Sequence, residues 1–378
     1  MTPSFDTSII HGREPKAKQG SKSQPIYQTS AYSFTSLEDM EGFFQQEHDY
    51  LYTRYGNPNT DELGELTAAA EGMPAGASAS SGMSAILAGV LATVSPGEHL
   101  VAPEDVYGGT FQMLENHLQA WGIEVTFVSF DTPGALEAAI QPNTAMVYAE
   151  SVTNPLLRVE DLSYLNEIKQ KHNLYLFVDN TFATPYFLKP AEAGADLVVH
   201  SATKYLGGHS DVTAGVLAGT APLIAEAKAK IIQLGLNLSP FEAWLAVRGV
   251  KTLSVRMARQ AENAARLTEA LNKTDINAVY YPQELSSHGN GAVVTIDLGA
   301  NYDVSRFFSS LDWVKIVATL AGVETTVSYP LGTSHRSVPE DLRSRLGINA
   351  QVVRISVGLE DAEDIIAVFQ QALKASTI

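Results

Sequence analysis

The chain is 378 residues long, enough for two or three domains with large buried cores. Acidic residues outnumber basic ones by 42 to 25, and the resulting net charge of −17 disfavours nucleic acid and anionic membranes as partners. The sequence has no cysteine, which excludes disulfides, thiolate nucleophiles and cysteine-based zinc sites, and its nine histidines form no H-x-x-x-H pair. We therefore expect no metal site.

The first predicted unit is an extended arm over residues 1–58. Its opening sequence, MTPSFDTSIIHGREPK, lacks the long apolar segment of a signal peptide, and no stretch of the chain is apolar for long enough to span a bilayer. These features predict a cytoplasmic protein. The aromatic-rich segment YSFTSLEDMEGFFQQEHDYLY predicts a short helix, and we expect the arm to pack against a neighbouring subunit.

Residues 59–245 alternate between short apolar runs and helical segments. Phe111, Leu114, Leu118 and Trp121 have the spacing of one apolar helix face. Six runs are nearly continuous in apolar residues, as in strands buried on both faces: HLVAP, EVTFVSF, AMVYAES, LYLFVDN, DLVVHS and GVLAG. This alternation predicts an α/β fold with a parallel or mostly parallel sheet and helices on both sides.

Residues 246–378 are predicted to form a second, smaller α/β domain. One long helix over residues 239–271 would cross the boundary, which we place near residue 245. Four later runs show more polar alternation, typical of strands covered on one face: GAVVTIDLG, WVKIVATL, TTVSYP and QVVRISVG. The acid-started segment EDAEDIIAVFQQALKAS predicts a closing helix.

Two strand ends carry a carboxylate and an amine. Asp179 lies near the end of LYLFVDN, and Lys204 follows DLVVHSAT. Ligands of open α/β sheets bind at the carboxyl ends of strands, so neighbouring strands would bring these side chains into one crevice. The alternative is that Asp179 caps a turn and Lys204 lies on the surface. The pair Gly207–Gly208, where the backbone must approach something closely, favours a site.

An aspartate and a lysine in one pocket suit pyridoxal phosphate. The lysine forms a Schiff base with the aldehyde, and the aspartate keeps the pyridine nitrogen protonated. The phosphate needs a separate cradle. Ser80, Ser81 and Gly82 precede a helical run whose first N–H groups would attract an anion, although such helix starts are common. Ser201 and Thr203 would add hydroxyl donors.

Five further residues are candidates for the same site. Tyr52 and Arg54 alternate in the arm, so an extended chain points both the same way, toward a possible phosphate. The ring of Tyr107, which precedes two glycines, would stack on a flat cofactor, and Asn154 ends another strand. Arg354 faces away from the core side of its strand and would grip an α-carboxylate. Each also has an ordinary explanation, as a core, turn or surface residue.

Seven segments together resemble the trans-sulfuration family of pyridoxal phosphate enzymes: SSGMSA, DVYGGT, TNPLL, VDNTFATP, HSATKYLGGHSD, SPFEAWLAVRGVKTL and VRISVGLED. That family includes cystathionine γ-lyases, β-lyases and γ-synthases and methionine γ-lyases, and the resemblance runs almost end to end. It implies the fold-type I architecture, with a large, mostly parallel seven-stranded sheet and a smaller C-terminal domain. It also implies pyridoxal 5′-phosphate as cofactor and a homotetramer built from dimers that share active sites.

The resemblance implies a role for each candidate residue. The catalytic residues would be Lys204, Asp179 and Tyr107, which would respectively bind the cofactor aldehyde, hold its ring nitrogen and stack on its ring. The phosphate ligands would be the amides of Gly82 and Met83, the hydroxyls of Ser201 and Thr203, and Tyr52 and Arg54 of a neighbouring subunit. The substrate ligands would be Asn154, Thr325 and Arg354 for the carboxylate and Glu324 for a distal ammonium.

Several positions depart from the family's pattern. Asn59 and Thr325 stand where Thr and Ser are usual, Ser334 replaces a Thr, and Asn237 replaces a small residue. Leu51 stands where several cystathionine γ-lyases have Glu. These departures concern the choice of substrate rather than the cofactor chemistry.

The reaction that the resemblance implies is γ-elimination from cystathionine, giving cysteine, 2-oxobutanoate and ammonia. Alternatives within the family are β-elimination and γ-replacement on an activated homoserine, while Gly109 stands where methionine γ-lyases carry a cysteine and disfavours that activity. Outside the family, an aminotransferase on the same fold would also use Lys204. A nucleotide-binding protein is disfavoured because neither G-x-G-x-x-G nor a Walker lysine occurs.

Overall fold

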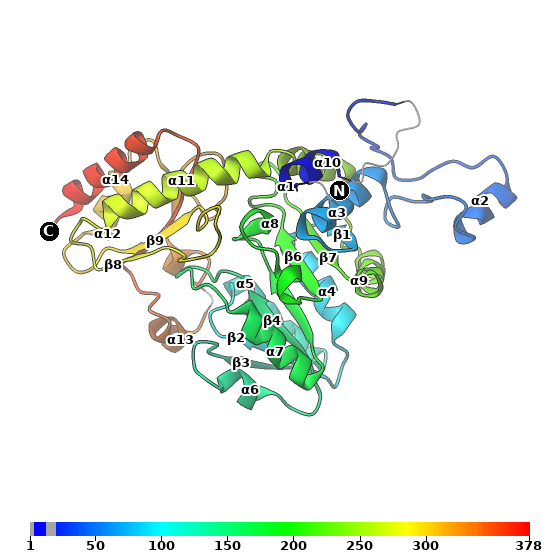
Figure 1. Ribbon diagram of the computed structural model, residues 1–378, viewed down its shortest axis with the longest axis horizontal. Coiled ribbons are helices and arrows are strands. Elements are labelled where there is room, and N and C mark those ends of the chain that lie inside the picture. The colour runs from blue at the N-terminus through cyan, green and yellow to red at the C-terminus, as the bar shows by residue number, and fades with distance from the viewer. Residues whose placement is uncertain (1–3, 13–19, 337) are drawn as a thin grey trace.

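A seven-stranded sheet forms the centre of the computed structural model, which describes residues 4–12, 20–336 and 338–378 (Figure 1). Its order is β1-β7-β6-β5-β4-β2-β3, and all neighbours are parallel except β7, which runs antiparallel to β1 and β6. The strands are Ala75–Ala79 (β1), His99–Pro103 (β2), Glu124–Val128 (β3), Thr144–Glu150 (β4), Tyr175–Asp179 (β5), Leu197–Ser201 (β6) and Gly215–Gly219 (β7). The predicted α/β class and mostly parallel sheet are confirmed.

Helices cover both faces of this sheet, which explains the continuous apolar runs. On β5, Phe177 packs into the core cluster that contains α4 (Gly82–Thr93) and α9 (Ala221–Leu234). Leu176 and Val178 belong to the opposite cluster, which contains α7 (Leu162–His172). The three central side chains of the strand, Leu176, Phe177 and Val178, are therefore buried on either face of the sheet.

The sequence did not predict β1. Its residues, AGASA, are all small and lack the β-branched and aromatic side chains typical of strands. A Cβ at Gly76 would lie 2.0 Å from the carbonyl oxygen of Gly64 in α3 (Pro58–Glu71). The small residues therefore allow α3 to lie directly on this strand.

The helix predicted around Phe111 is irregular. It comprises α5 (Gly108–Gln112) and a π-helical segment, η1 (Met113–Leu118). Leu114 and Leu118 are buried as predicted, but Trp121 is 49% exposed, so its assignment to the apolar face was wrong. A π-turn holds more residues than an α-turn, and it shifts later positions around the helix axis.

The N-terminal arm carries two short helices, α1 (Phe5–His11) and α2 (Leu37–Phe44). Ser36 caps α2 by accepting a hydrogen bond from the backbone N–H of Asp39 at 3.1 Å. Figure 1 shows α2 projecting away from the body of the molecule. The short helix expected in this segment is confirmed.

The smaller domain contains a five-stranded sheet in the order β10-β11-β12-β9-β8. Its strands are Ala278–Tyr280 (β8), Val293–Asp297 (β9), Lys315–Ile316 (β10), Thr326–Ser328 (β11) and Val352–Ser356 (β12). The helices α11 (Leu253–Leu271), α12 (Val304–Ser309) and α14 (Ala362–Ser376) contribute to its core, and α13 (Glu340–Arg345) lies apart from them (Figure 1). None of the described helices is long and apolar enough to cross a membrane.

The single helix predicted over residues 239–271 is wrong, because it is broken into α10 (Pro240–Val250) and α11. The hydroxyl of Thr252 donates to the carbonyl of Gly249 at 3.0 Å and ends the first helix. Arg256 of α11 donates to the carbonyls of Gly249 and Tyr205 at 2.8 and 2.9 Å. Because α10 packs on α3 of the large domain, we propose that the domains divide at residues 251–252 rather than at 245.

Candidate active site

A cavity of about 570 Å³ lies at the carboxyl ends of β4, β5 and β6. Its far wall comes from the smaller domain, through Arg354 on β12, Ala318, Leu320 and residues 332–334. This is the edge of an open α/β sheet where ligands bind. Nine of the predicted site residues line it: Gly82, Met83, Tyr107, Asn154, Asp179, Ser201, Thr203, Lys204 and Arg354.

Lys204 follows β6 and points its amine into this cavity. The Nζ atom donates to the hydroxyl of Thr319 at 2.7 Å. Burial, with the nearby positive charge of Arg354, lowers the pKa of Lys204 to about 8. The amine is therefore placed in a cavity and readily deprotonated, unlike a solvated surface lysine.

The glycine pair after Lys204 serves the protein's own packing. Gly208 has φ +73°, and a Cβ there would lie 2.1 Å from a guanidinium nitrogen of Arg256. A Cβ at Gly207 would lie 2.6 Å from the carbonyl oxygen of Ala202. The close approach that the sequence implied is therefore made by protein atoms.

Two carboxyl groups lie side by side at the ends of neighbouring strands. Asp179 on β5 and Glu150 on β4 are register partners, and both line the cavity. Asp179 accepts from the backbone N–H of Thr181 at 2.9 Å, and Glu150 accepts from that of Tyr107 at 2.7 Å. Burial raises the pKa of both carboxyl groups. The sequence reasoning missed Glu150, although it ends a predicted strand as Asp179 does.

The N-terminus of α4 forms one end of the cavity. Ser81 caps the helix by accepting from the N–H of Ser84 at 3.1 Å, which leaves the amides of Gly82 and Met83 without intrahelical acceptors. A Cβ at Gly82 would lie 2.7 Å from the Cβ of Ser201, so the helix start lies against the end of β6. The two free amides would suit an anion bound beside the hydroxyl of Ser201.

Thr203 lines the same end of the cavity, but its hydroxyl is already engaged. It donates to the carbonyl of Ala214 at 3.2 Å and accepts from the N–H of Ala214 at 3.1 Å. A bond from this hydroxyl to a phosphate would require it to give up the first of these contacts.

Arg354 lies near Lys204, since both side chains contact Thr319, and it is almost fully buried. Its Nη1 donates to Oδ1 of Asn154 at 2.8 Å, and its Nη2 donates to the carbonyl of Thr319 at 3.2 Å. Burial lowers its pKa to about 10, and no carboxylate among the described residues forms an ion pair with it. A buried cation with neutral partners is costly unless an anionic ligand pairs with it.

Two predicted substrate ligands lie elsewhere. The hydroxyl of Thr325 donates to Glu360 at 2.8 Å and accepts from the N–H of Gly358 at 2.9 Å. Glu324 pairs with Lys315 at 2.8 Å, and both side chains are substantially exposed. Neither Thr325 nor Glu324 is among the described residues that line the cavity, so the structure does not support these two assignments.

Thr319, which the sequence did not single out, is the threonine that contacts Lys204 and Arg354. The sequence reasoning assigned residues 313–320 to one strand, but β10 ends at Ile316. The chain beyond it runs along the cavity wall, where Ala318 and Leu320 line the cavity and Thr319 contacts Lys204. The end of so short a strand leaves no signal in the sequence.

Tyr52 and Arg54 line a separate cavity of about 390 Å³, together with Asn237 and Ser239. Arg54 donates to the carbonyl of Ile232 at 3.1 Å, and its guanidinium lies over the ring of Tyr55. Neither Tyr52 nor Arg54 is among the described residues that line the Lys204 cavity of their own chain. They would therefore contact a cofactor phosphate only in the cavity of a neighbouring subunit.

The model of one protein family, described as Cys/Met metabolism PLP-dependent enzyme, matches residues 6–374. The chain belongs to this family. Three similar relatives are the L-methionine γ-lyase of Porphyromonas gingivalis (39% identity; 99% of this chain and 98% of the relative), the cystathionine γ-lyase of Bacillus subtilis (39%; 97% and 98%) and the cystathionine β-lyase of Lactococcus lactis subsp. cremoris (38%; 98% and 99%). These relatives are almost equally similar to this chain, yet they are named for different substrates or reactions.

Solved structures agree with this assignment to the Cys/Met metabolism family. Cystathionine γ-lyase from Lactobacillus plantarum, complexed with L-serine, has a TM-score of 0.92 at 33% identity, with 99% of each chain covered. A putative O-acetylhomoserine (thiol)-lyase from Campylobacter jejuni has a TM-score of 0.92 at 28% identity, covering 98% of this chain and 100% of that one. The second structure contains N′-pyridoxyl-lysine-5′-monophosphate. The cofactor of this family member is therefore pyridoxal 5′-phosphate, as the sequence predicted.

The cavity of this Cys/Met metabolism enzyme fits that cofactor. Three features that line this space would each hold one part of the cofactor. The buried amine of Lys204 suits the aldehyde, the carboxyl group of Asp179 suits the ring nitrogen, and the N-terminus of α4 suits the phosphate. Met83 and Ser201 lie at the helix end of this space, and Tyr107, 40% exposed, lies on its wall. The described residues contain no group of three side chains that could hold a metal ion.

His335, next to the cavity-lining Ser334, makes the stability of this family member sensitive to acid. Its buried ring contacts the hydroxyl of Ser334 at 2.9 Å, and burial lowers its pKa to about 4 from 6.5. Between these values the unfolded chain binds a proton that the folded chain excludes, so this contribution to stability is present above pH 6.5 and lost as the pH falls toward 4. We expect this effect of His335 to lower the free energy of unfolding by about 2 kcal/mol when the pH falls from 7.5 to 5.

The test compares chemical denaturation of the wild type and His335→Gln at both pH values. Between pH 7.5 and 5, the free energy of unfolding of the variant should fall by about 2 kcal/mol less than that of the wild type, because glutamine does not titrate. Equal losses in the two proteins would contradict the prediction, whatever their absolute stabilities.

Proposed function

We propose that the chain is a lyase that cleaves the C–S bond at the γ-carbon of cystathionine and releases cysteine, 2-oxobutanoate and ammonia. The observation that carries this proposal is that Lys204, Arg354 and Asn154 line one cavity, where Lys204 and Arg354 both contact Thr319. A reactive amine close to a carboxylate-binding pair suits an α-amino acid substrate. The choice of cystathionine rests on the Bacillus subtilis and Lactobacillus plantarum enzymes, because the site predicted for the distal ammonium lies outside the cavity.

Lys204 would transfer protons at the substrate. Pyridoxal phosphate, when bound, withdraws electrons from the α-carbon and makes its proton acidic. With a pKa of about 8, the free amine of Lys204 is partly neutral near pH 7.5 and would accept that proton. The hydroxyl of Thr319 holds the amine at 2.7 Å. Asp179 would keep a proton on the ring nitrogen from the opposite side of the cavity.

The remaining residues would orient the substrate and its leaving group. Arg354 and Asn154, the carboxylate-binding pair, would hold the α-carboxylate and so fix the α-proton in front of Lys204. Tyr107 lies at the start of α5 with its ring in the cavity wall. Its hydroxyl would donate a proton to the departing sulfur, a contribution commonly worth about 10²–10⁴ in rate.

Product analysis with cystathionine tests this proposal. We expect 2-oxobutanoate and cysteine in equal amounts, measured by chromatography of the reaction mixture. Pyruvate with homocysteine would replace the proposal with β-elimination. Formation of pyridoxamine phosphate without release of a thiol would replace it with an aminotransferase reaction.

We further propose that two subunits share each active site, within a homotetramer. The projecting arm exposes the apolar side chains of Leu37, Met40 and Phe44, which a second copy of the chain would cover. Tyr52 and Arg54, at the base of this arm, would then serve the neighbouring cavity. The cytoplasmic location stays a prediction.

Mixing two inactive variants tests the shared site. Arg54→Ala should lose cofactor affinity, because the phosphate loses a charged ligand, and Lys204→Ala should lose turnover. After subunit exchange, hybrid dimers contain one cavity with both native residues, so we expect part of the wild-type activity to return. Proof of exchange by differently tagged subunits, with no returning activity, would contradict the proposal.

A further inference from the structure

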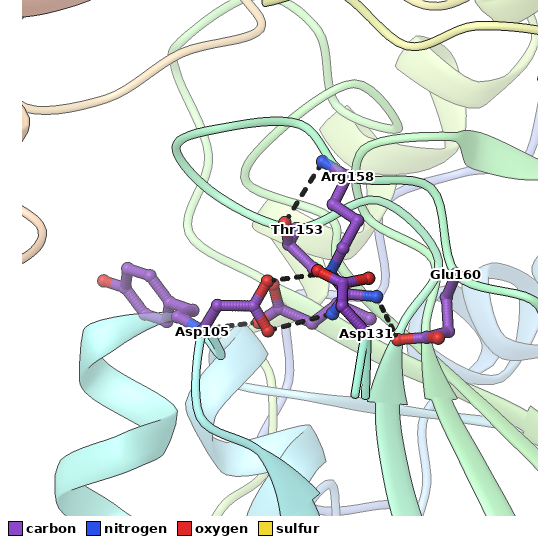
Figure 2. Close-up of polar contacts among 7 residues, drawn as sticks. Asp105, Asp131, Thr153, Arg158 and Glu160 are labelled. Carbon is purple, nitrogen blue, oxygen red and sulfur yellow. Dashed lines mark hydrogen bonds and ion pairs between the residues drawn. The ribbon is translucent and has the colours of Figure 1, made fainter. Parts of the chain in front are cut away.

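Arg158 forms a cluster of ion pairs outside the cavity. Its Nε and Nη2 donate to the two carboxylate oxygens of Asp105 at 3.1 and 2.9 Å, and its Nη1 donates to Glu160 at 2.8 Å. Asp131 approaches Nε at 3.3 Å from a much more exposed position. Figure 2 shows the guanidinium of Arg158 among these three carboxylates. The side chain of Arg158 is 18% exposed, so these contacts are largely shielded from water.

The backbone of Arg158 closes the loop that carries Asn154. Its N–H donates to the hydroxyl of Thr153 at 3.2 Å, and its carbonyl accepts from the N–H of Thr153 at 2.9 Å. The isolated bridge between Val152 and Val159 continues this pairing. Asn154 therefore lies next to the base of a loop that Arg158 closes, and its side chain contacts Arg354.

The side chain of Arg158 holds a second loop that reaches the cavity. Asp105 lies two residues before Tyr107, and the N–H of Tyr107 donates to Glu150 at 2.7 Å. The two-pronged contact between Arg158 and Asp105 fixes both position and angle, because a planar guanidinium matches a carboxylate. One residue thus connects the loop of Tyr107 to the loop of Asn154.

We propose that Arg158 is a positioning residue that sets the distance between Tyr107 and the carboxylate-binding pair. This inference rests on the proposed function, since it assumes that Asn154 and Arg354 bind the substrate carboxylate. Arg158 lines no part of the cavity. It acts through Asp105 on one side and Thr153 on the other. Loss of its guanidinium shifts the two loops apart and weakens the hold on the substrate before it affects the cofactor.

The experiment uses the cofactor-loaded enzyme and glycine, an amino acid that has the carboxylate and amine but no leaving group. We expect Arg158→Met to weaken glycine binding and raise KM for cystathionine by about 10- to 100-fold, with a smaller change in kcat and full retention of the cofactor. Binding is followed by the visible absorption of the cofactor. Arg158→Lys should recover part of the loss, because an ammonium keeps the charge but not the two-pronged contact.

The matched control is Arg345→Met, which removes a mostly exposed guanidinium paired with Glu104, the neighbour of Asp105. It should leave glycine binding and KM unchanged. A lower melting temperature in Arg158→Met with unchanged glycine binding and KM would overturn the inference and leave Arg158 a structural residue. Should that variant fail to fold, Arg158→Lys and Asp105→Asn decide by the same measurements.

The outcome also separates this inference from the proposed function. If the wild type binds glycine but releases no 2-oxobutanoate from cystathionine, the proposed reaction fails, and a loss of glycine binding in Arg158→Met still supports the positioning role. If the wild type performs the reaction and the variant matches it in glycine binding and KM, only the positioning role fails.

Discussion

Lys204→Ala should be a folded protein that has lost cystathionine turnover by about 10⁴-fold or more. The variant removes the amine that would both hold the cofactor and move the α-proton. Methyl replacement leaves Thr319 without its partner but introduces no buried charge, so the fold should survive. The measurement is 2-oxobutanoate release, with circular dichroism to confirm folding.

The control for this variant is Lys273→Ala, in which a highly exposed lysine paired with Glu269 is removed. It should retain wild-type turnover, because exposed ion pairs contribute little. Turnover by Lys204→Ala within tenfold of the wild type would refute the assignment of this lysine. So would a yellow colour that survives both the substitution and borohydride treatment.

Arg354→Met should lower kcat/KM by about 30-fold to several thousand-fold, mostly through KM. Truncating one partner of a buried charge pair costs about 2–5 kcal/mol, and under the proposed function this pair would form when the substrate carboxylate binds. The folded protein without substrate should be as stable as the wild type or more so. Its buried guanidinium has neutral partners, and a methionine of similar length avoids the cost of desolvating the charge.

Both halves of this second prediction are measurable. Steady-state kinetics give the ratio of kcat/KM, and thermal unfolding without substrate gives the stability. Arg259→Met, which removes a surface guanidinium near Glu262, is the control for general effects of losing an arginine. A variant with unchanged KM, or with a large loss of stability in the absence of substrate, would show that Arg354 has a structural role instead.

The sheet was predictable where burial leaves a continuous apolar run. Residues 175–179 and 215–219 could be assigned from their own side chains, since both faces of each strand are covered. Residues 75–79 could not, because that strand consists of small residues that let α3 approach. The break between α10 and α11 was equally hidden, since it depends in part on Arg256 contacting the carbonyl of Tyr205, which is distant in sequence.

The site was predictable where a residue follows a strong strand. Lys204, Asp179 and Asn154 all follow such strands and all line the cavity. Thr319 was missed because β10 has two residues and its end cannot be seen in the sequence. Glu150 was missed because only Asp179 was considered as a carboxylate at a strand end. The parallel register of β4 and β5 in fact places Glu150 next to Asp179.

Arg256 belongs to the smaller domain, yet it fills the space beside Gly208 and holds the carbonyl of Tyr205, the residue next to Lys204. The turn that carries Lys204 is therefore held to α11 by a hydrogen bond, and the two must move together. A hinge between the domains cannot open this side of the cavity without breaking buried hydrogen bonds. Entry and exit of amino acids would instead require movement elsewhere around the cavity.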